Sequence, residues 1–251
     1  PQFSYETMMN RVDIDGLMTI LNGMDWDKKL TIVLHTPGGE VGACDTITSY
    51  LIEKFPKLEF IIPTYAMSAG TMMSMAGETI IMGRQSQLGP IDPQLPVHGG
   101  MVSSLDILQQ FKQAADSISK DRNTALLWSP ILERMGPALP NQALRSLDNA
   151  KTMVINWMVA RGLSNKDAEK IAQFFSEGDG VFKNLNHGQR IDRVMASRAG
   201  LNIEELEKNG SLQDAVLTAY HCASIYCGRT LASKFFVSDH KKHWTFNVPK
   251  R

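Results

Sequence analysis

The sequence predicts an α/β fold built around a parallel sheet. Three short apolar runs, 29–34, 60–64 and 79–82, are predicted strands. Apolar residues with helical spacing fill the intervals, over 41–54 and 71–76. Strands that alternate with helices in this order pair in parallel through right-handed crossovers. Ligand sites in such sheets lie beyond the carboxyl ends of the strands.

The elements have recognisable boundaries in the sequence. The first strand ends at the breaker HTPGG, residues 35–39, and Pro56 ends the helix that follows. A short helix is predicted before the sheet at 13–22, where an aspartate can cap its start. The second half of the chain has helical periodicity, with a break at the prolines of 130–140. Its predicted helices are 103–121, 141–161, 165–175, 190–200, 203–208 and 211–227.

The composition is that of a globular protein without an electrostatic sign of a nucleic-acid partner. Lys plus Arg and Asp plus Glu both number 26, so the formal net charge is zero. The basic segment 240–251 is interpreted as a solvated terminus. Three cysteines, Cys44, Cys222 and Cys227, do not form a disulfide framework. A reducing compartment, and hence a cytoplasmic location, is expected.

The sequence shows neither a membrane span nor a cofactor motif. No apolar run approaches the roughly 18 residues that a span needs, and no signal peptide is found. Because the chain begins at Pro1 rather than at Met, membrane association is expected only through an upstream segment. Cys222 and Cys227 have poor spacing for zinc and are interpreted as helix-core residues. No metal or organic cofactor is expected.

Ser68 is the candidate nucleophile. It comes directly after the second predicted strand, and the small residues Ala66, Ala69 and Gly70 around it leave room for a substrate backbone. A serine at a helix start places developing negative charge near free N–H groups and the positive end of the helix dipole. The alternative is a plain N-cap serine.

Gly38 and Gly39 form a candidate oxyanion hole. A strand that ends in Pro-Gly-Gly presents backbone N–H groups without side-chain obstruction. Because this turn and Ser68 follow consecutive parallel strands, they are expected to be neighbours. The alternative is a simple strand-to-helix turn.

Asp92 lies in a rigid loop after the third strand, in the segment 88–94, LGPIDPQ. A carboxylate in this frame is a candidate for orienting a general base. The alternative is an aspartate that stabilises a turn.

A serine nucleophile needs a general base, and His35, His98, His187 and a lysine are candidates. Lys151 lies on an apolar helical stripe, where desolvation would lower the pKa of its amine. An equally good stripe omits Lys151, whose amine would then extend to water. The stripe that includes Lys151 consists of residues 144, 147, 151, 154 and 158, and the stripe that omits it consists of residues 143, 147, 150, 154 and 157. Lys112 has a similar edge position, with less support as a base.

His187 lies in a polar loop, Leu185-Asn186-His187-Gly188, before a predicted helix. A histidine at this position either serves catalysis or caps the helix.

The segments 34–39, 65–71 and 88–94 occur in order at regular spacing and together resemble the serine dehydrogenase proteinase family. That family belongs to the Clp protease/crotonase superfamily and is related to peptidases of the signal peptide peptidase A type. The resemblance is strong over 10–96 and continues in register over 140–205.

This resemblance implies a Clp protease/crotonase-like fold of stacked β-β-α units with a helical C-terminal part. Residues 1–205 would form the serine peptidase domain, and 206–251 a helical extension with a basic tail. The implied activity is that of a serine endopeptidase acting on peptides or proteins. A homo-oligomer, with a partner that delivers substrate, is also implied.

The resemblance also implies roles for individual residues. Ser68 would be the nucleophile, the N–H groups of Gly39 and Ala69 the oxyanion hole, and Gly38 and Gly70 substrate contacts. Two candidates for the general base stay open. One is His187, in a Ser68–His187–Asp92 triad in which the aspartate precedes the histidine along the chain, the reverse of their order in the Clp proteolytic subunit. The other is Lys151.

Two rival functions accompany this prediction. The first is a catalytically silent scaffold that binds peptides or partner proteins. The second is a crotonase-like enzyme acting on an acyl thioester, which would use the oxyanion hole without Ser68.

Overall fold

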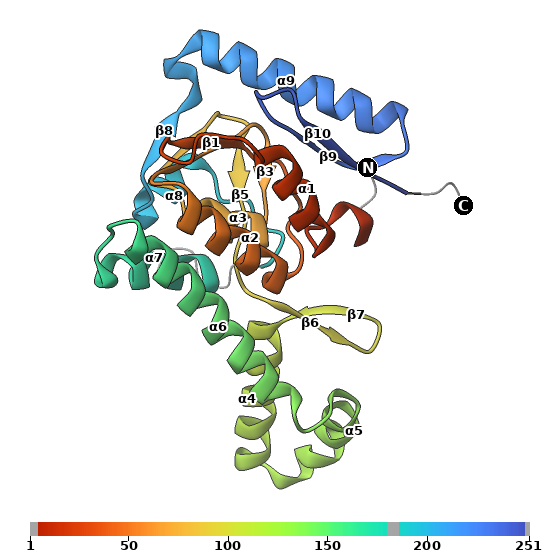
Figure 1. Ribbon diagram of the computed structural model, residues 1–251. Helices are drawn as coiled ribbons and strands as arrows, with labels where there is room; N and C mark the ends of the chain where they lie inside the picture. Colours follow the sequence, from red (N-terminus) through yellow and green to blue (C-terminus); the bar gives the residue numbers. More distant parts are fainter. Residues whose placement is uncertain (1–4, 180–185, 249–251) are drawn as a thin grey trace.

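The computed structural model describes residues 5–179 and 186–248, and a four-stranded parallel sheet lies at its centre (Figure 1). The spatial order of its strands is β1-β2-β4-β8. Phe60 in β2 lies beside Ile32 of β1 on one side and Ile80 of β4 on the other. Aromatic and β-branched residues suit such buried strand positions. The strands span Leu30–Val33 (β1), Leu58–Ile62 (β2), Thr79–Met82 (β4) and Ile203–Glu205 (β8).

A second, shorter layer of strands continues from the carboxyl ends of the first. Its strands β3 and β5 pair in parallel, and a bridge from Thr36 to Ala66 and another from Leu88 to Ile191 extend it at both sides. β1 therefore leads through Thr36 into α2, and β2 leads through β3 into α3. The predicted stack of β-β-α units is confirmed. These elements span Tyr65–Ala66 (β3), Gln87–Leu88 (β5), Val41–Lys54 (α2) and Ala69–Ser74 (α3).

The main core lies between the sheet and its covering helices. Phe60, Met72 and Phe175 are among its fully buried side chains. One long helix, α6, buries the stripe of residues 143, 147, 150, 154 and 157, which omits Lys151. The helices on this side are α1 (Val12–Leu21), α2, α6 (Leu139–Ala160), α7 (Asn165–Glu177) and α8 (Arg193–Ala199).

A helical arm projects from this body (Figure 1). It has a small core of its own around Ile107, Leu139 and Ala143. The helix α5 was not predicted, since Pro130 was expected to break the chain. Pro130 instead lies inside α5, where Leu126 is 80% exposed, so water can satisfy the carbonyl group that the proline leaves free. The arm comprises β6 (Gln94–Val97), β7 (Gly100–Ser103), α4 (Ser104–Lys120), Arg122–Thr124 (η2), α5 (Ala125–Met135) and the start of α6.

The C-terminal region differs from the predicted helices and tail. The predicted helix 203–208 is the strand β8 and a 3-10 turn, because β8 pairs with the edge of β4. The segment expected as a solvated terminus contributes the β10 strand of an antiparallel hairpin, and Trp244 packs against Gly16 of α1. The remaining elements are Tyr5–Thr7 (η1), Leu206–Lys208 (η3), α9 (Gly210–Arg229), β9 (Ala232–Val237) and β10 (His243–Asn247).

The helix α9 lies on the outer face of the sheet, where Val216 packs on Ile61 and Ile81. Cys222 is exposed and Cys227 half-buried, so the interpretation of both as helix-core residues is wrong. Most of α9 faces solvent rather than a second layer of helices, which explains the difference. Among the described helices, none is long and apolar enough to cross a membrane.

Candidate active site

Ser68 occupies a strained turn between β3 and α3. Its φ of 50° and ψ of −117° place it among the few non-glycine residues with positive φ in the described chain. Such strain persists only where surrounding contacts enforce it, and it is typical of functional sites. Ser68 occupies the N-cap position of α3, but its side chain makes no capping hydrogen bond to the helix. The half-buried hydroxyl is left for another partner.

Contacts on both sides hold this turn. The N–H of Met67 donates to the carbonyl of Thr36 at 3.0 Å, and the Thr71 hydroxyl donates to the carbonyl of Ala66 at 2.7 Å. The N–H of Gly89 in turn donates to the Thr71 hydroxyl at 2.9 Å. The turn around Ser68 is therefore tied to the end of the first β-β-α unit and to the loop that carries Asp92.

Gly38 lies directly against the Ser68 turn. A Cβ on Gly38 would stand 2.8 Å from Cβ of Ser68 and 2.6 Å from the carbonyl oxygen of Met67. Its φ is 99°, and its N–H donates to the Thr36 hydroxyl at 3.1 Å. Only glycine combines this backbone conformation with such a close approach. The expected adjacency of the glycine turn and Ser68 is thus present.

The N–H groups of Gly39 and Ala69 are available as donors. Ala69 begins α3, where backbone N–H groups have no intrahelical acceptor. Met9 donates its N–H to the Gly38 carbonyl and accepts from the N–H of Glu40, which leaves the N–H of Gly39 between them unused. Within residues 5–179 and 186–248, neither donor has a hydrogen-bond partner. Two free donors beside a serine can stabilise an oxyanion.

Gly70 has a packing role in this structure. It is buried, and a Cβ there would stand 2.4 Å from Cγ2 of Thr36. The absence of a side chain therefore lets α3 approach the end of β1. Contact of Gly38 or Gly70 with a substrate stays a prediction.

Asp92 and His187 meet although 95 residues separate them in the chain. Oδ1 of Asp92 lies 3.0 Å from Nδ1 of His187. Because a carboxylate only accepts, the ring N–H at Nδ1 is the donor. Asp92 is fully buried, whereas the His187 side chain is 24% exposed. The second carboxylate oxygen is buried and has no partner among the described residues.

The segment of His187 is also attached to the loop after β5. Leu88 and Ile191 exchange two backbone hydrogen bonds of 2.9 Å. A Cβ on Gly89, the residue after Leu88, would stand 3.5 Å from the backbone nitrogen of Ser68. The chain of contacts Ser68–Gly89–Leu88–Ile191 therefore brings the His187 segment to the edge of the sheet where Ser68 lies. No hydrogen bond between Ser68 and His187 is present in the described residues.

Lys151 is engaged elsewhere. Its amine forms an ion pair with Glu177 at the end of α7, and its side chain is 23% exposed. The stripe that α6 buries omits Lys151, which lies at its edge, partly buried.

The other candidate bases lie in different settings. His35 bonds through Nδ1 to the hydroxyl of Thr64, and its ring lies between Tyr65 and Tyr220. Burial lowers the pKa of His35 to about 4. His98 lies exposed in the turn between β6 and β7, and Lys112 is exposed on α4.

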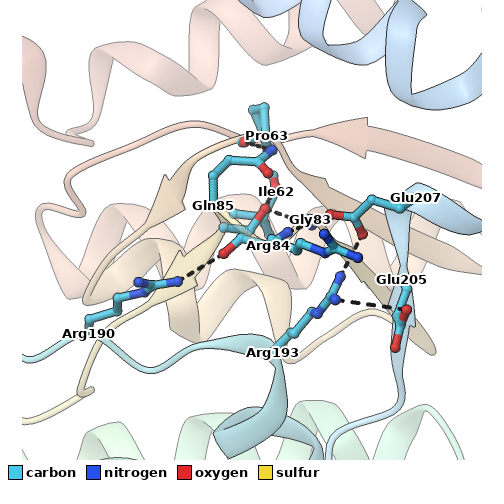
Figure 2. Close-up of polar contacts among 10 residues, drawn as sticks. Ile62, Pro63, Gly83, Arg84, Gln85, Arg190, Arg193, Glu205 and Glu207 are labelled. Atoms are coloured by element: carbon cyan, nitrogen blue, oxygen red, sulfur yellow. Dashed lines mark hydrogen bonds and ion pairs between the residues drawn. The ribbon is translucent and has the colours of Figure 1, made fainter. Parts of the chain in front are cut away.

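Sequence reasoning missed a cluster of charged residues at the carboxyl ends of β4 and β8 (Figure 2). Arg190 donates to the backbone carbonyl of Arg84 at 2.9 Å, and the N–H of Arg84 donates to Glu207 at 2.7 Å. Arg193 pairs with Glu207 and, at 3.8 Å, with Glu205. The cluster fixes the β4–β5 loop to the segment that follows His187. Only the spacing of charges in two distant segments could have suggested it.

The described residues contain no group of three or more His, Cys, Asp or Glu side chains that could hold a metal ion. A strained serine, two free N–H donors and a carboxylate–imidazole pair are groups that can support acid–base and nucleophilic chemistry.

Residues 7–179 match the sequence profile of the family described as ClpP-like SDH-type serine proteinase. The chain belongs to this family of ClpP-like serine proteinases. The matched region contains Ser68, both glycines of the turn, Asp92 and Lys151, and it ends before His187. The family and the β-β-α stack together establish a ClpP-like fold.

Two proteins of Methanocaldococcus jannaschii, both called uncharacterized, are similar in sequence to this ClpP-like chain. MJ0137 is 37% identical over 192 residues, which cover 76% of this chain and 59% of that protein. MJ1495 is 34% identical over 95 residues, which cover 38% of this chain and 31% of that protein. The chain thus spans about three fifths or less of these relatives.

Two solved structures are similar in shape at a low level. A membrane-bound stomatin-specific protease, 1510-N, gives a TM-score of 0.47 at 14% identity, covering 78% of this chain and 75% of that one. ClpP1 from Listeria monocytogenes gives a TM-score of 0.43 at 15% identity, covering 82% and 90%.

Proposed function

We propose that this chain is a serine endopeptidase that hydrolyses peptide bonds through an acyl-enzyme on Ser68. His187 is the general base in this proposal, and Asp92 orients it. The observation that carries the proposal is the hydrogen bond between the buried Asp92 carboxylate and Nδ1 of His187. Proton donation at Nδ1 fixes the tautomer in which Nε2 can accept a proton.

In the first half of the reaction, Nε2 of His187 takes the hydroxyl proton as Oγ of Ser68 bonds to the substrate carbonyl carbon. The carbonyl electrons move to the oxygen, which accepts hydrogen bonds from the N–H groups of Gly39 and Ala69. The C–N bond then breaks, and His187 gives the proton to the leaving amine. The product is an ester on Ser68.

In the second half, His187 removes a proton from water, and the resulting hydroxide attacks the ester carbonyl. The same two N–H groups stabilise the second oxyanion. The C–O bond to Ser68 breaks, Ser68 recovers its proton from His187, and a carboxylic acid leaves. The imidazolium that forms twice is stabilised by the charge of Asp92.

The first test is a covalent one. Wild type treated with a fluorophosphonate probe is expected to gain the mass of one adduct in intact-mass spectrometry, and Ser68→Ala none. Activated serines react with such probes because the base and the oxyanion hole act on the phosphorus centre as on a carbonyl. Circular dichroism of both proteins shows whether they are folded. A folded wild type that gains no adduct would contradict the proposal.

Lys151 is the alternative base, and a pair of variants distinguishes it from His187. His187→Gln is expected to slow labelling by about 10³-fold or more, because it removes the proton acceptor. Lys151→Met is expected to label within about threefold of wild type, because the lysine is paired with Glu177. The reverse pattern, measured as second-order labelling rates, would assign the base to Lys151.

The silent scaffold is the second candidate, and one observation favours it: Ser68 and His187 are not hydrogen-bonded to each other in the described residues. Catalytic hydrogen bonds are often long without substrate, so we rank the silent scaffold second.

We further propose that the substrates are peptides or proteins, that the chain forms a homo-oligomer, and that a partner delivers substrate. The crotonase-like rival uses the oxyanion hole without Ser68. Activity on an acyl thioester that Ser68→Ala retains would therefore point to that reaction.

A further inference from the structure

A buried ion pair joins the two ends of the described chain. Nζ of Lys234, in β9, lies 2.8 and 2.9 Å from the two carboxylate oxygens of Asp13, in the first turn of α1. The side chains are 7% and 5% exposed. Desolvation makes such a pair a poor source of stability by itself. Its use in this molecule must therefore come from what it holds in place.

Asp13 also forms a hydrogen bond with the segment before α1. Its Oδ2 accepts the N–H of Asn10 at 2.9 Å, and Oδ1 of Asn10 accepts the N–H of Val12 at 3.1 Å. Asn10 is buried. Burial raises the pKa of the Asp13 carboxyl, while the bonds from Lys234 and Asn10 oppose that rise. Without the ammonium group of Lys234, the buried Asp13 carboxyl would lose a partner that favours its charged form, and its hydrogen bond from the N–H of Asn10 would weaken.

Met9, the residue before Asn10, forms backbone hydrogen bonds to both neighbours of Gly39 in the candidate oxyanion hole. The N–H of Met9 donates to the Gly38 carbonyl at 2.7 Å, and the Met9 carbonyl accepts the N–H of Glu40 at 2.8 Å. A Cβ on Gly39 would stand only 2.2 Å from the Met9 oxygen, so the two backbones are in direct contact. Met9 thus supports the glycine turn at Gly39, while Gly38 lies against the Ser68 turn.

We propose that Lys234 is a positioning residue for the oxyanion hole, acting through Asp13, Asn10 and Met9 on the N–H of Gly39. The inference rests on the proposed function of Ser68 and Gly39. It also gives a role to the β9–β10 hairpin, which lies outside the region that matches the family. The hairpin closes on α1 and fixes the far side of the glycine turn.

The test compares three variants of the whole chain. Lys234→Met removes the charge and keeps much of the volume. Lys234→Arg restores a cation that can bond to both oxygens. Phe236→Ala is the matched control, because it weakens the same hairpin at its contact with Trp244 but changes neither member of the ion pair. Lys234→Gln is a milder second variant in case Lys234→Met does not fold.

Hydrogen–deuterium exchange and probe labelling are the two measurements. In Lys234→Met we expect amide exchange at Met9 and Glu40 to accelerate about tenfold or more, and labelling of Ser68 to slow about tenfold or more. Lys234→Gln is expected to change both in the same direction by less. Phe236→Ala should leave both within about twofold, and Lys234→Arg within about threefold.

The outcomes separate the two proposals. Unchanged exchange at Met9 and Glu40 in folded Lys234→Met overturns the inference, whatever the labelling shows. Equal slowing in Lys234→Met and Phe236→Ala also overturns it, because only general stability would then be involved. If wild type is not labelled, the proposed function fails, and exchange alone decides whether Lys234 holds the glycine turn.

Discussion

Replacing Asp92 with Asn is expected to slow fluorophosphonate labelling of Ser68 by about 10³- to 10⁴-fold. The Asp92 carboxylate is fully buried and accepts a hydrogen bond from the N–H at Nδ1 of His187, at 3.0 Å. An amide removes the charge that stabilises the imidazolium, and its NH₂ group can select the wrong tautomer of the ring. The measurement is the second-order labelling rate, followed by intact mass.

The fold of Asp92→Asn should be retained. A neutral amide is less costly to bury than a carboxylate, and one oxygen of Asp92 has no partner among the described residues. The matched control is Asp192→Asn, which makes the same chemical change five residues after His187, at the residue that caps the start of α8. Asn caps a helix as well as Asp does, so the control should label within about twofold of wild type. Labelling of Asp92→Asn at the wild-type rate would remove Asp92 from the mechanism.

Replacing Gly38 with Ala is expected to lower labelling about 100-fold or more and the free energy of unfolding by about 2–4 kcal/mol. The new Cβ would stand 2.6 Å from the Met67 oxygen and 2.8 Å from Cβ of Ser68, at a φ of 99°. Relief of this overlap must push the glycine turn away from Ser68. Labelling rates and denaturant unfolding measure the two effects.

Gly42→Ala is the control for this substitution. Gly42 lies in the first turn of α2, close in sequence to Gly38, and a Cβ there meets nothing within 4 Å. Alanine in a helix is more favourable than glycine by about 0.5–1 kcal/mol, so this variant should be slightly more stable and label normally. Equal behaviour of the two variants would show that the contact of Gly38 with the Ser68 turn has no catalytic consequence.

The alternation of strands and helices from β1 to β4, and the position of Ser68 in the turn before α3, could be predicted from local sequence, whereas the short strand β3 was expected to be part of that turn. Short apolar runs that end in Pro-Gly-Gly or small residues predict a strand followed by a turn, because proline fixes φ and glycine allows the positive φ that turns require. The adjacency of Gly38 and Ser68 followed from the parallel order of consecutive strands. The hairpin of β9 and β10 did not follow, since its strands depend on packing against α1.

Which of the candidate bases contacts Asp92 depends on how the chain packs and could not be read from the sequence. Two helical stripes of α6 were equally apolar in sequence, and packing buried the one that omits Lys151. His187 and Asp92 are separated by 95 residues, and no local pattern encodes a contact of that range. The same holds for Lys234 and Asp13, 221 residues apart. Local sequence sets turns and strands through backbone sterics, whereas the pairing of distant charges depends on how the whole chain packs.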